Sequence, residues 1–427
     1  MRRTFYETSQ DIQDRAVLVT LITDEVRRSR LRPEDSLQEL VQLAETAGVA
    51  VLSVMMQQRE SADPKWFIGK GKVAELGAVI AELDATTAIF DQELSGAQVR
   101  NLEEALDVKI IDRTQLILDI FAQRAKTREG IIQVELAQLS YLLPRLSGHG
   151  RNLSRLGGGI GTRGPGETKL ETDRRHIRRR ISDLKRQLEE VVRHRGVYRE
   201  RRKKSGAIQV ALVGYTNAGK STLLRQLTEA DVYVENQLFA TLDPTSRQWE
   251  LPNGKLTILT DTVGFIQHLP HELVASFRAT LEEVNEADLI LHVVDASSLM
   301  REEQMRVVDD ILQQLGAGAK PQIVIYNKKD MCIEEQRQML PLDESHFLIS
   351  AYDEADLEQV RLAVQQHLSG GTVTYRLPGA RGDLIALAHR IGEVLEQETD
   401  GENVRLTVRL DRAEAELHSY KLEPYLS

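Results

Sequence analysis

The 427-residue sequence has little of what builds covalent cross-links or membrane structures. Its single cysteine, Cys332, excludes a disulfide framework and a cysteine-based zinc cluster. Its apolar runs all fall short of the roughly 20 residues that a membrane span needs. No hydrophobic signal core follows Met1. We therefore expect a cytoplasmic protein without a membrane span, folded into about three domains of roughly 150 residues each.

Charge is distributed unevenly along the chain. The whole sequence carries a formal net charge of −10. Residues 145–204 hold 19 lysines and arginines against 7 acidic residues, a net charge of +12, so the rest of the chain carries −22. A basic block on an acidic protein indicates a polyanionic partner, and the alternative is a solvated charged helix.

Four short runs rich in β-branched residues alternate with stretches of helical spacing in the first part of the chain. This alternation predicts a small parallel α/β domain over residues 1–125. Asp35 or Ser36 and Ser95 are candidate helix N-caps, and Gly48 is a candidate helix stop. The expected strands are 16–22, 49–56, 86–90 and 108–112.

Two matching heptad stripes follow, on either side of a Gly-rich connection. They predict an antiparallel helical hairpin over residues 126–204. Its tip, about 147–166, is longer than a helix–helix turn needs, and most of the run GGGIGTRGPGE lies in it. The stripes are Ile132, Leu136, Leu139, Leu143 and Leu146, then Ile177, Ile181, Leu184, Leu188 and Val191.

Residues 208–222, IQVALVGYTNAGKST, match a P-loop. An apolar strand leads into Gly214, and Gly219, Lys220 and Ser221 complete the pattern G-x-x-x-x-G-K-[ST]. The glycines allow backbone N–H groups to approach phosphates. We expect Lys220 to reach the β- and γ-phosphate oxygens and Ser221 to bind Mg²⁺. The expected nucleotide-binding loop is therefore 214–221, and we do not expect the Gly-rich tip to bind the nucleotide.

Further segments complete a guanine-nucleotide pattern in the right order. The stretch LTILTDTVG brings Asp261 near Mg²⁺ and Gly264 near the γ-phosphate, and the loop LFATLDPT makes Thr241 the second protein ligand to Mg²⁺. In QIVIYNKKD, Asp330 can accept both N–H groups of guanine's Watson–Crick edge, which discriminates strongly against other bases. In HFLISA, the pair 350–351 offers a backbone N–H to the guanine oxygen.

These motifs predict a GTPase domain over 205–370 and a small C-terminal α/β domain over 371–427. In the C-terminal domain we expect a helix near 381–396 and a turn at Asp400–Gly401. The expected catalytic residues are Lys220, Thr241 and Gly264, and the expected Mg²⁺ ligands are Ser221 and Thr241. The expected nucleotide-binding residues are Gly214, Tyr215, Thr216, Asn217, Ala218, Gly219, Lys220, Ser221, Thr222, Phe239, Ala240, Thr241, Leu242, Asp243, Asp261, Thr262, Val263, Gly264, Asn327, Lys328, Lys329, Asp330, Ser350, Ala351 and Tyr352.

Over nearly its whole length the sequence resembles the HflX family of translation-associated GTPases. The resemblance is carried by FIGKGK, NLEEALDVKIIDRTQLILDIFAQRA, VELAQL, GGGIGTRGPGETKLETDRR, GYTNAGKSTL, LFATLDPT and DTVGFIQHLP. It implies a ribosome-binding GTPase, bound to GTP or GDP, that engages the large subunit and can separate ribosomal subunits. It also implies that the N-terminal domain and hairpin reach toward the peptidyl-transferase centre. We expect a monomer when the protein is free.

The hairpin tip is expected to contact ribosomal RNA through its backbone and its cations. Two alternatives remain open at this point: a GTPase in ribosomal subunit assembly, and an RNA-remodelling protein with a separate N-terminal ATP-dependent activity. The expected RNA contacts are Arg151, Arg155, Gly158, Arg163, Gly164 and Lys169.

The catalytic pattern has one gap. Ras-like GTPases orient the attacking water with a glutamine directly after the DxxG motif, where this chain has Phe265. Gln267 lies two residues further on. Basal hydrolysis should therefore be slow and depend on the ribosome or on a potassium ion. Asn217 stands where potassium-dependent GTPases of similar sequence have a cation-coordinating asparagine; alternatively it hydrogen-bonds its own loop.

Two residues of the strand DLILHVVD are interpreted as structural. His292 lies in a buried-strand pattern and is read as a core histidine. Asp295 ends the same strand and is read as a loop cap rather than a ligand.

Overall fold

The computed structural model describes seven ranges of the chain: residues 14–24, 32–146, 169–204, 208–229, 237–267, 283–411 and 419–427. The chain divides into two compact units, and each is described by itself. The first unit comprises residues 1–192 with 235–243 and 266–279. The second comprises residues 193–234, 244–265 and 280–427. None of the helices in the described ranges is long and apolar enough to span a bilayer.

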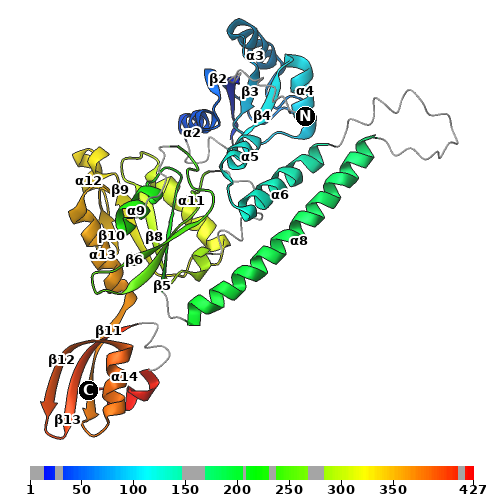
Figure 1. Cartoon of the computed structure of the whole chain (residues 1–427). Helices are drawn as coiled ribbons and strands as arrows, with labels where there is room; N and C mark the ends of the chain where they lie inside the picture. Colours follow the sequence, from blue (N-terminus) through cyan, green and yellow to red (C-terminus); the bar gives the residue numbers. More distant parts are fainter. Residues whose placement is uncertain are drawn as a thin grey trace, which may run out of the picture. The chain divides into compact units, whose positions relative to one another are not determined.

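The first unit begins with a four-stranded parallel sheet, in the order β2-β1-β3-β4 (Figure 1). Helices α2 and α5 contact each other, as do α3 and α4. Strand β3 is buried throughout, as expected for a parallel sheet covered on both faces. The parallel α/β fold predicted from the sequence is confirmed. Its elements are β1 (Arg15–Ile22), α2 (Pro33–Thr46), β2 (Ala50–Gln58), α3 (Lys70–Leu83), β3 (Thr87–Phe90), α4 (Gly96–Leu106), β4 (Lys109–Asp112) and α5 (Arg113–Arg124).

Two of the predicted helix boundaries are confirmed and one is wrong. Ser95 caps α4 in a capping box, and Gly48 follows α2 in the left-handed region with φ +82°. Neither Asp35 nor Ser36 caps α2, because the helix already begins at Pro33. A proline at the first helical position has its φ preset for the helix and lacks only an N–H that would be unpaired there anyway.

The predicted hairpin is formed by α6 (Arg128–Arg145) and α8 (Lys169–Lys204), which lie side by side in Figure 1. The guanidinium of Arg180 donates to both carboxylate oxygens of Glu135, at 2.6 and 2.7 Å. The predicted tip lies outside the described residues. The apolar seam between the helices consists of Ile132, Leu136 and Leu184, with Leu139, Ile181 and Leu188 packed against them, as the heptad stripes predicted.

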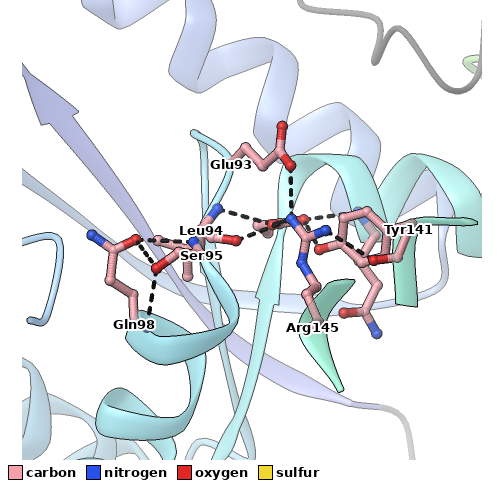
Figure 2. Close-up of polar contacts among 8 residues, drawn as sticks. Glu93, Leu94, Ser95, Gln98, Tyr141 and Arg145 are labelled. Carbon is pink, nitrogen blue, oxygen red and sulfur yellow. Dashed lines mark hydrogen bonds and ion pairs between the residues drawn. The ribbon is translucent and has the colours of Figure 1, made fainter. Parts of the chain in front are cut away.

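A polar network fixes the end of α6 to the sheet domain (Figure 2). The Arg145 guanidinium lies 3.5 Å from the centroid of the Tyr141 ring and donates to a Glu93 carboxylate oxygen and to the Leu94 carbonyl, at 2.8 and 3.0 Å. The Tyr141 hydroxyl donates to Asp112, which ends β4, at 2.6 Å. The point at which the chain leaves α6 toward the tip is therefore anchored on the N-terminal sheet domain.

The second unit contains a six-stranded sheet in the order β10-β9-β8-β5-β7-β6. All neighbours are parallel except β6 and β7, which are antiparallel. The parallel strands end at the same edge, where ligands bind in open α/β sheets. Its elements are β5 (Ile208–Gly214), α9 (Lys220–Thr228), β6 (Thr245–Glu250), β7 (Leu256–Asp261), β8 (Leu289–Asp295), α11 (Arg301–Gln314), β9 (Gln322–Asn327), η2 (Lys329–Met331), α12 (Glu334–Gln338), β10 (His346–Leu348) and α13 (Glu354–Leu368).

The C-terminal part of this unit is an antiparallel sheet in the order β11-β13-β12. The helix predicted near 381–396 is too long, because it ends at Ile391 and Gly392 opens a strand. Gly392 pairs with Leu410, and a Cβ on it would stand 2.4 Å from the Arg409 carbonyl oxygen. The elements are β11 (Ser369–Pro378), α14 (Gly382–Ile391), β12 (Gly392–Asp400), β13 (Asn403–Asp411), η3 (Ser419–Lys421) and η4 (Glu423–Tyr425).

Candidate nucleotide-binding site

The P-loop joins β5 to α9 at the carboxyl edge of the six-stranded sheet. Gly214 and Gly219 have φ of +154° and +97°, and Asn217 is also left-handed with φ +60°. A Cβ on Gly214 would stand 2.1 Å from the Val293 carbonyl oxygen, so only glycine fits between the two strands. This glycine-dependent turn leads into the N-terminus of α9, an arrangement that presents backbone N–H groups to an anion.

Lys220 is folded into the loop. Its ammonium donates to the carbonyls of Gly214 and Tyr215, at 3.1 and 2.9 Å, and the residue is 6% exposed. Burial lowers the pKa of Lys220 to about 8, and the charge of Asp261 opposes part of that shift. The carbonyls therefore hold a cation whose charge is costly to bury.

Ser221 and Asp261 are brought together, as the sequence predicted for a Mg²⁺ site. The Ser221 hydroxyl donates to the Asp261 carboxylate at 2.7 Å, and Asp261 is fully buried at the end of β7. A hydroxyl and a carboxylate are hard oxygen donors of the kind that Mg²⁺ prefers. The residues present fit that ion.

The DTVGF segment runs beside the P-loop. The Thr216 N–H donates to the Phe265 carbonyl at 2.8 Å, and the Phe265 N–H donates to the Gly214 carbonyl at 3.1 Å. A Cβ on Gly264 would stand 3.0 Å from the Lys220 ammonium nitrogen, so the backbone here lies close to that lysine. Phe265 is 1% exposed, and its ring belongs to the core.

The predicted base-recognition loops are joined to each other and to the P-loop. The Asn327 amide donates to the Ala218 carbonyl at 3.0 Å, and its oxygen accepts from the Ala351 N–H at 3.1 Å. The Ser350 hydroxyl donates to Asp330 at 2.7 Å. The P-loop, residues 327–330 and residues 350–351 are therefore joined by hydrogen bonds into one network. Tyr352 is 71% exposed at the edge of this network.

Sequence reasoning missed the roles of two carboxylates. Asp295 is a loop cap, as interpreted, because it accepts from the Ser297 N–H at 3.0 Å, but it also accepts from the Lys328 ammonium at 2.7 Å. Asp356, in the first turn of α13, accepts from the Lys329 ammonium at 2.9 Å. The one signal for Asp356 in the sequence was its position six residues after Ser350, which places it on the first helical turn beyond the SA motif.

The core interpretation of His292 is confirmed. The residue is 2% exposed on β8, and burial, reinforced by the charge of Lys220, lowers the pKa of His292 to about 4. Cys332 is also buried. Neither residue is placed to react.

Residues 237–243, which contain the predicted ligand Thr241, belong to the first unit. The Phe239 ring meets the Phe121 ring of α5 edge-on, with centroids 4.7 Å apart. The Asp243 carboxylate accepts from the backbone N–H groups of Lys126 and Thr127, both at 2.9 Å, and from the Thr127 hydroxyl. Asp243 thus holds the residues just before the hairpin helix α6, including Thr127, which is the N-cap of that helix. The predicted nucleotide residues in this segment are Phe239, Ala240, Thr241, Leu242 and Asp243.

Five of the predicted RNA contacts lie outside the described residues. The sixth, Lys169, is the first residue of α8. The five are Arg151, Arg155, Gly158, Arg163 and Gly164.

Comparison with known proteins identifies the family. Three family models match successive parts of the chain: "GTP-binding GTPase N-terminal" over residues 34–122, "GTP-binding GTPase Middle Region" over 124–202 and "50S ribosome-binding GTPase" over 209–328. The chain is 52% identical to the GTPase HflX of Alkalihalophilus pseudofirmus, over 92% of this chain and 93% of that protein. The chain belongs to the HflX family of GTPases.

A second curated relative and a solved structure are also similar to this chain. The GTPase HflX of Escherichia coli is 44% identical over 88% of this chain and 90% of that protein. A solved structure, a GTP-binding protein from the archaeon Sulfolobus solfataricus in complex with GDP, is 24% identical, with a TM-score of 0.43, over 83% of this chain and 98% of that one. The resemblance inferred from the motifs is confirmed, and the chain is a P-loop GTPase that hydrolyses GTP.

Proposed function

We propose that this HflX-family GTPase couples Mg²⁺-dependent GTP hydrolysis to binding of the large ribosomal subunit, and that it acts in subunit splitting, recycling or rescue. The observation that carries the proposal is the basic helix α8, on which Arg178, Arg179 and Lys185 are exposed. Exposed cations beside a Gly-rich tip suit the phosphate backbone of structured RNA. The match to the model described as "50S ribosome-binding GTPase" supports the choice of particle.

Within the nucleotide site each residue has a distinct task. The Lys220 ammonium exchanges its two carbonyl partners for β- and γ-phosphate oxygens. Ser221 and Thr241 would hold Mg²⁺, which would supply positive charge to offset the charge that develops on the phosphates. Asp330 reads the guanine base, and a backbone N–H at Ala351 reads its oxygen.

Water positioning is the weakest part of this site. The ring of Phe265 is a core side chain, so the chain has no hydrogen-bonding group at the place of the Ras-like glutamine. A bound ribosome, a K⁺ ion held at Asn217, or both, would supply the missing ordering and charge. Basal hydrolysis is accordingly expected to be slow.

The proposal is tested by co-sedimentation of the full chain with large subunits, small subunits and whole ribosomes. With a non-hydrolysable GTP analogue we expect binding to large subunits, and with GTP we expect whole ribosomes to separate. Binding confined to immature large particles, with no separation, would favour the assembly alternative. Binding to no particle would remove the ribosomal proposal and leave the GTPase assignment intact.

The contribution of the hairpin to ribosome binding is measured in a salt series. Replacing Arg178 and Arg179 with alanine, or deleting 157–166, should weaken binding and lower the salt slope by about 0.7–0.9 for each RNA phosphate that the variant no longer neutralises. Basal hydrolysis should not change. Arg306→Ala, on α11 and partly exposed, is the matched control because Arg306 pairs with Glu303. If wild type and hairpin variants bind the ribosome with equal affinity at every salt concentration, α8 is a solvated charged helix that does not contact RNA.

A further inference from the structure

Two lysines directly precede the carboxylate assigned to the guanine base. Lys328, Lys329 and Asp330 are consecutive, so both ammonium groups are within reach of the Asp330 region. A lysine that paired with Asp330 would compete with guanine for the same carboxylate oxygens. The base site therefore needs a place for each lysine other than Asp330.

Lys328 is held by Asp295. Its ammonium is 2.7 Å from one carboxylate oxygen, and the two side chains are 21% and 20% exposed. The other oxygen of Asp295 accepts from the N–H and the hydroxyl of Ser297, at 3.0 and 2.6 Å. The carboxylate is thus fixed by its own loop and turned toward Lys328, which is itself left-handed with φ +65°.

Lys329 is held by Asp356. Its ammonium is 2.9 and 3.0 Å from the two carboxylate oxygens, and the Asp356 side chain is 6% exposed. One of these oxygens also accepts from the Ser350 N–H at 2.8 Å. The Asp356 carboxylate therefore binds the Lys329 ammonium and at the same time fixes the backbone at Ser350.

Asp330 has a different kind of partner. One of its carboxylate oxygens accepts a hydrogen bond from the Ser350 hydroxyl at 2.7 Å. Both lysines are engaged by other carboxylates. Ser350 therefore links Asp330 to Asp356, because its hydroxyl donates to Asp330 and its N–H donates to Asp356. The residue that fixes the position of Asp330 is thus held by the carboxylate that binds Lys329.

We propose that Asp295 and Asp356 are specificity-positioning residues, which hold Lys328 and Lys329 away from Asp330 so that its carboxylate remains available to the N1–H and 2-amino groups of guanine. The inference deepens the proposed function and rests on its assignment of Asp330 to the base. It concerns base discrimination and not the phosphate end of the site.

Asp356→Asn is the most direct test. Asparagine keeps an oxygen for the Ser350 N–H but loses the ion pair, which frees Lys329 to pair with Asp330. We expect GDP affinity to fall about tenfold, in the range of one charged hydrogen bond. The preference for GDP over IDP, which lacks only the 2-amino group, should narrow because the carboxylate is occupied.

Removing the lysine separates this mechanism from a merely structural role. Asp356→Asn with Lys329→Met should show the same GDP-to-IDP preference as Lys329→Met alone, because no ammonium is left at position 329 to compete for Asp330. A structural defect at Asp356 would not be repaired by deleting a second side chain. Asp343→Asn, an exposed carboxylate in the same domain that pairs with His346, is the matched control.

All variants are titrated as full chains with GDP, IDP and XDP, and their nucleotide-free melting temperatures are compared. An unchanged GDP-to-IDP preference in Asp356→Asn, or a double variant no better than the single one, would overturn the proposal. Should Asp356→Asn not fold, Asp295→Asn with and without Lys328→Met gives the same test on the other lysine. Asp330→Asn serves as the reference. If Asp330→Asn gains no XDP affinity, the assignment of Asp330 to the base fails. If Asp330→Asn gains XDP affinity but Asp356→Asn keeps the wild-type GDP-to-IDP preference, only the present inference is rejected.

Discussion

At the scale of single residues, Lys220 makes nucleotide affinity depend on pH. Burial lowers its pKa to about 8, yet phosphate binding requires the ammonium form. As pH rises through 8 the nucleotide-free protein loses this proton, so GDP affinity should fall by about tenfold for each further pH unit. Titrations with GDP between about pH 7 and 9 measure the slope. A flat profile would show that the loop does not depress this pKa.

The same proton affects stability in the opposite direction. The unfolded chain keeps it up to the ordinary lysine pKa of 10.5, so between pH 8 and 10.5 the unfolded state binds more protons than the native state. The free energy of unfolding of the nucleotide-free protein should therefore rise with pH in that window. Urea unfolding of wild type and Lys220→Met checks this, because the methionine variant should lose the lysine's contribution to the slope.

Asn217 carries a second prediction at this scale. It is exposed and left-handed in the P-loop, so its side chain is not consumed by the core. If it holds K⁺ beside the phosphates, turnover in KCl should exceed turnover in NaCl by about 10²-fold or more, the range for losing one preorganised charge-stabilising group. Asn217→Ala should abolish the difference, with turnover measured at saturating GTP so that a change in nucleotide affinity does not enter the comparison. Equal turnover of the wild type in both salts would leave Asn217 with a loop role.

Residue roles that depend on local backbone shape were predictable, and those that depend on tertiary contacts were not. Gly214, Lys220 and Ser221 follow a strand in a fixed spacing, so the motif alone indicates their geometry. The role of Asp356 requires a helix 27 residues along the chain from Lys329 to dock beside it. No periodicity in the sequence expresses that distance.

At the scale of elements, the start of α6 is built around Asp243. Its carboxylate occupies the position that a side chain on Gly130 would need, since a Cβ there would stand 2.4 Å from a carboxylate oxygen. Replacing a helical glycine with alanine ordinarily stabilises a protein by about 1 kcal/mol. Here Gly130→Ala should instead destabilise, because it displaces the carboxylate that holds Thr127, the N-cap of α6, and caps are worth about 0.5–2 kcal/mol.

A double-variant cycle tests that reversal of sign. In an Asp243→Ala background the carboxylate is gone and the Thr127 hydroxyl oxygen, 3.2 Å from an added Cβ, can turn aside, so Gly130→Ala should regain most of its ordinary stabilisation of about 1 kcal/mol. Urea unfolding of the four proteins gives the coupling free energy. Gly77→Ala on α3, where the nearest atom to an added Cβ is 3.5 Å away, is the control for helix propensity alone. Additive effects would mean that Asp243 is not the reason for the glycine.

The elements themselves were largely predictable, with one instructive error. Strand–helix alternation and the heptad stripes led to the parallel sheet and the α6–α8 seam, because each pattern has a single period. The segment 381–400 changes period at Gly392, from α14 directly into β12. The helical pattern was therefore extended five residues too far, to 396, and the strand was missed until its pairing with β13 was visible.

At the scale of the whole molecule, the segment expected to bind the nucleotide is not confined to one compact unit. Residues 235–243, from the middle of the GTPase sequence, cluster with the N-terminal unit and its hairpin. Thr241 lies in this segment, between Phe239, whose ring packs on Phe121 of α5, and Asp243, whose carboxylate holds the residues that precede α6. A predicted Mg²⁺ ligand is therefore carried by the unit that is expected to meet the ribosome.

This arrangement leads to a prediction about ribosome-stimulated hydrolysis. Coupling between two sites is typically worth about 1–3 kcal/mol, which corresponds to about 5–150-fold. Phe239→Leu, which removes the edge-on ring contact and keeps apolar volume, should reduce stimulation of GTP turnover by large ribosomal subunits within that range. Asp243→Asn should do the same, because a neutral amide oxygen accepts the hydrogen bonds from Lys126 and Thr127 less strongly than a carboxylate does.

Basal turnover and GDP affinity are measured for the same variants, because Phe239 and Asp243 flank Thr241 and stimulation must be compared with each variant's own basal rate. Asp84→Asn is the control: it removes a surface ion pair with Arg15 in the first unit, and asparagine suits the left-handed φ of +50° at this position. The measurement is GTP turnover by full chains at rising concentrations of large subunits, with binding followed in parallel by sedimentation. If the variants bind the subunit and are stimulated as strongly as the wild type, the hairpin does not act through residues 237–243. If they bind it but are no longer stimulated, the segment that carries Thr241 is the route by which the ribosome reaches the nucleotide.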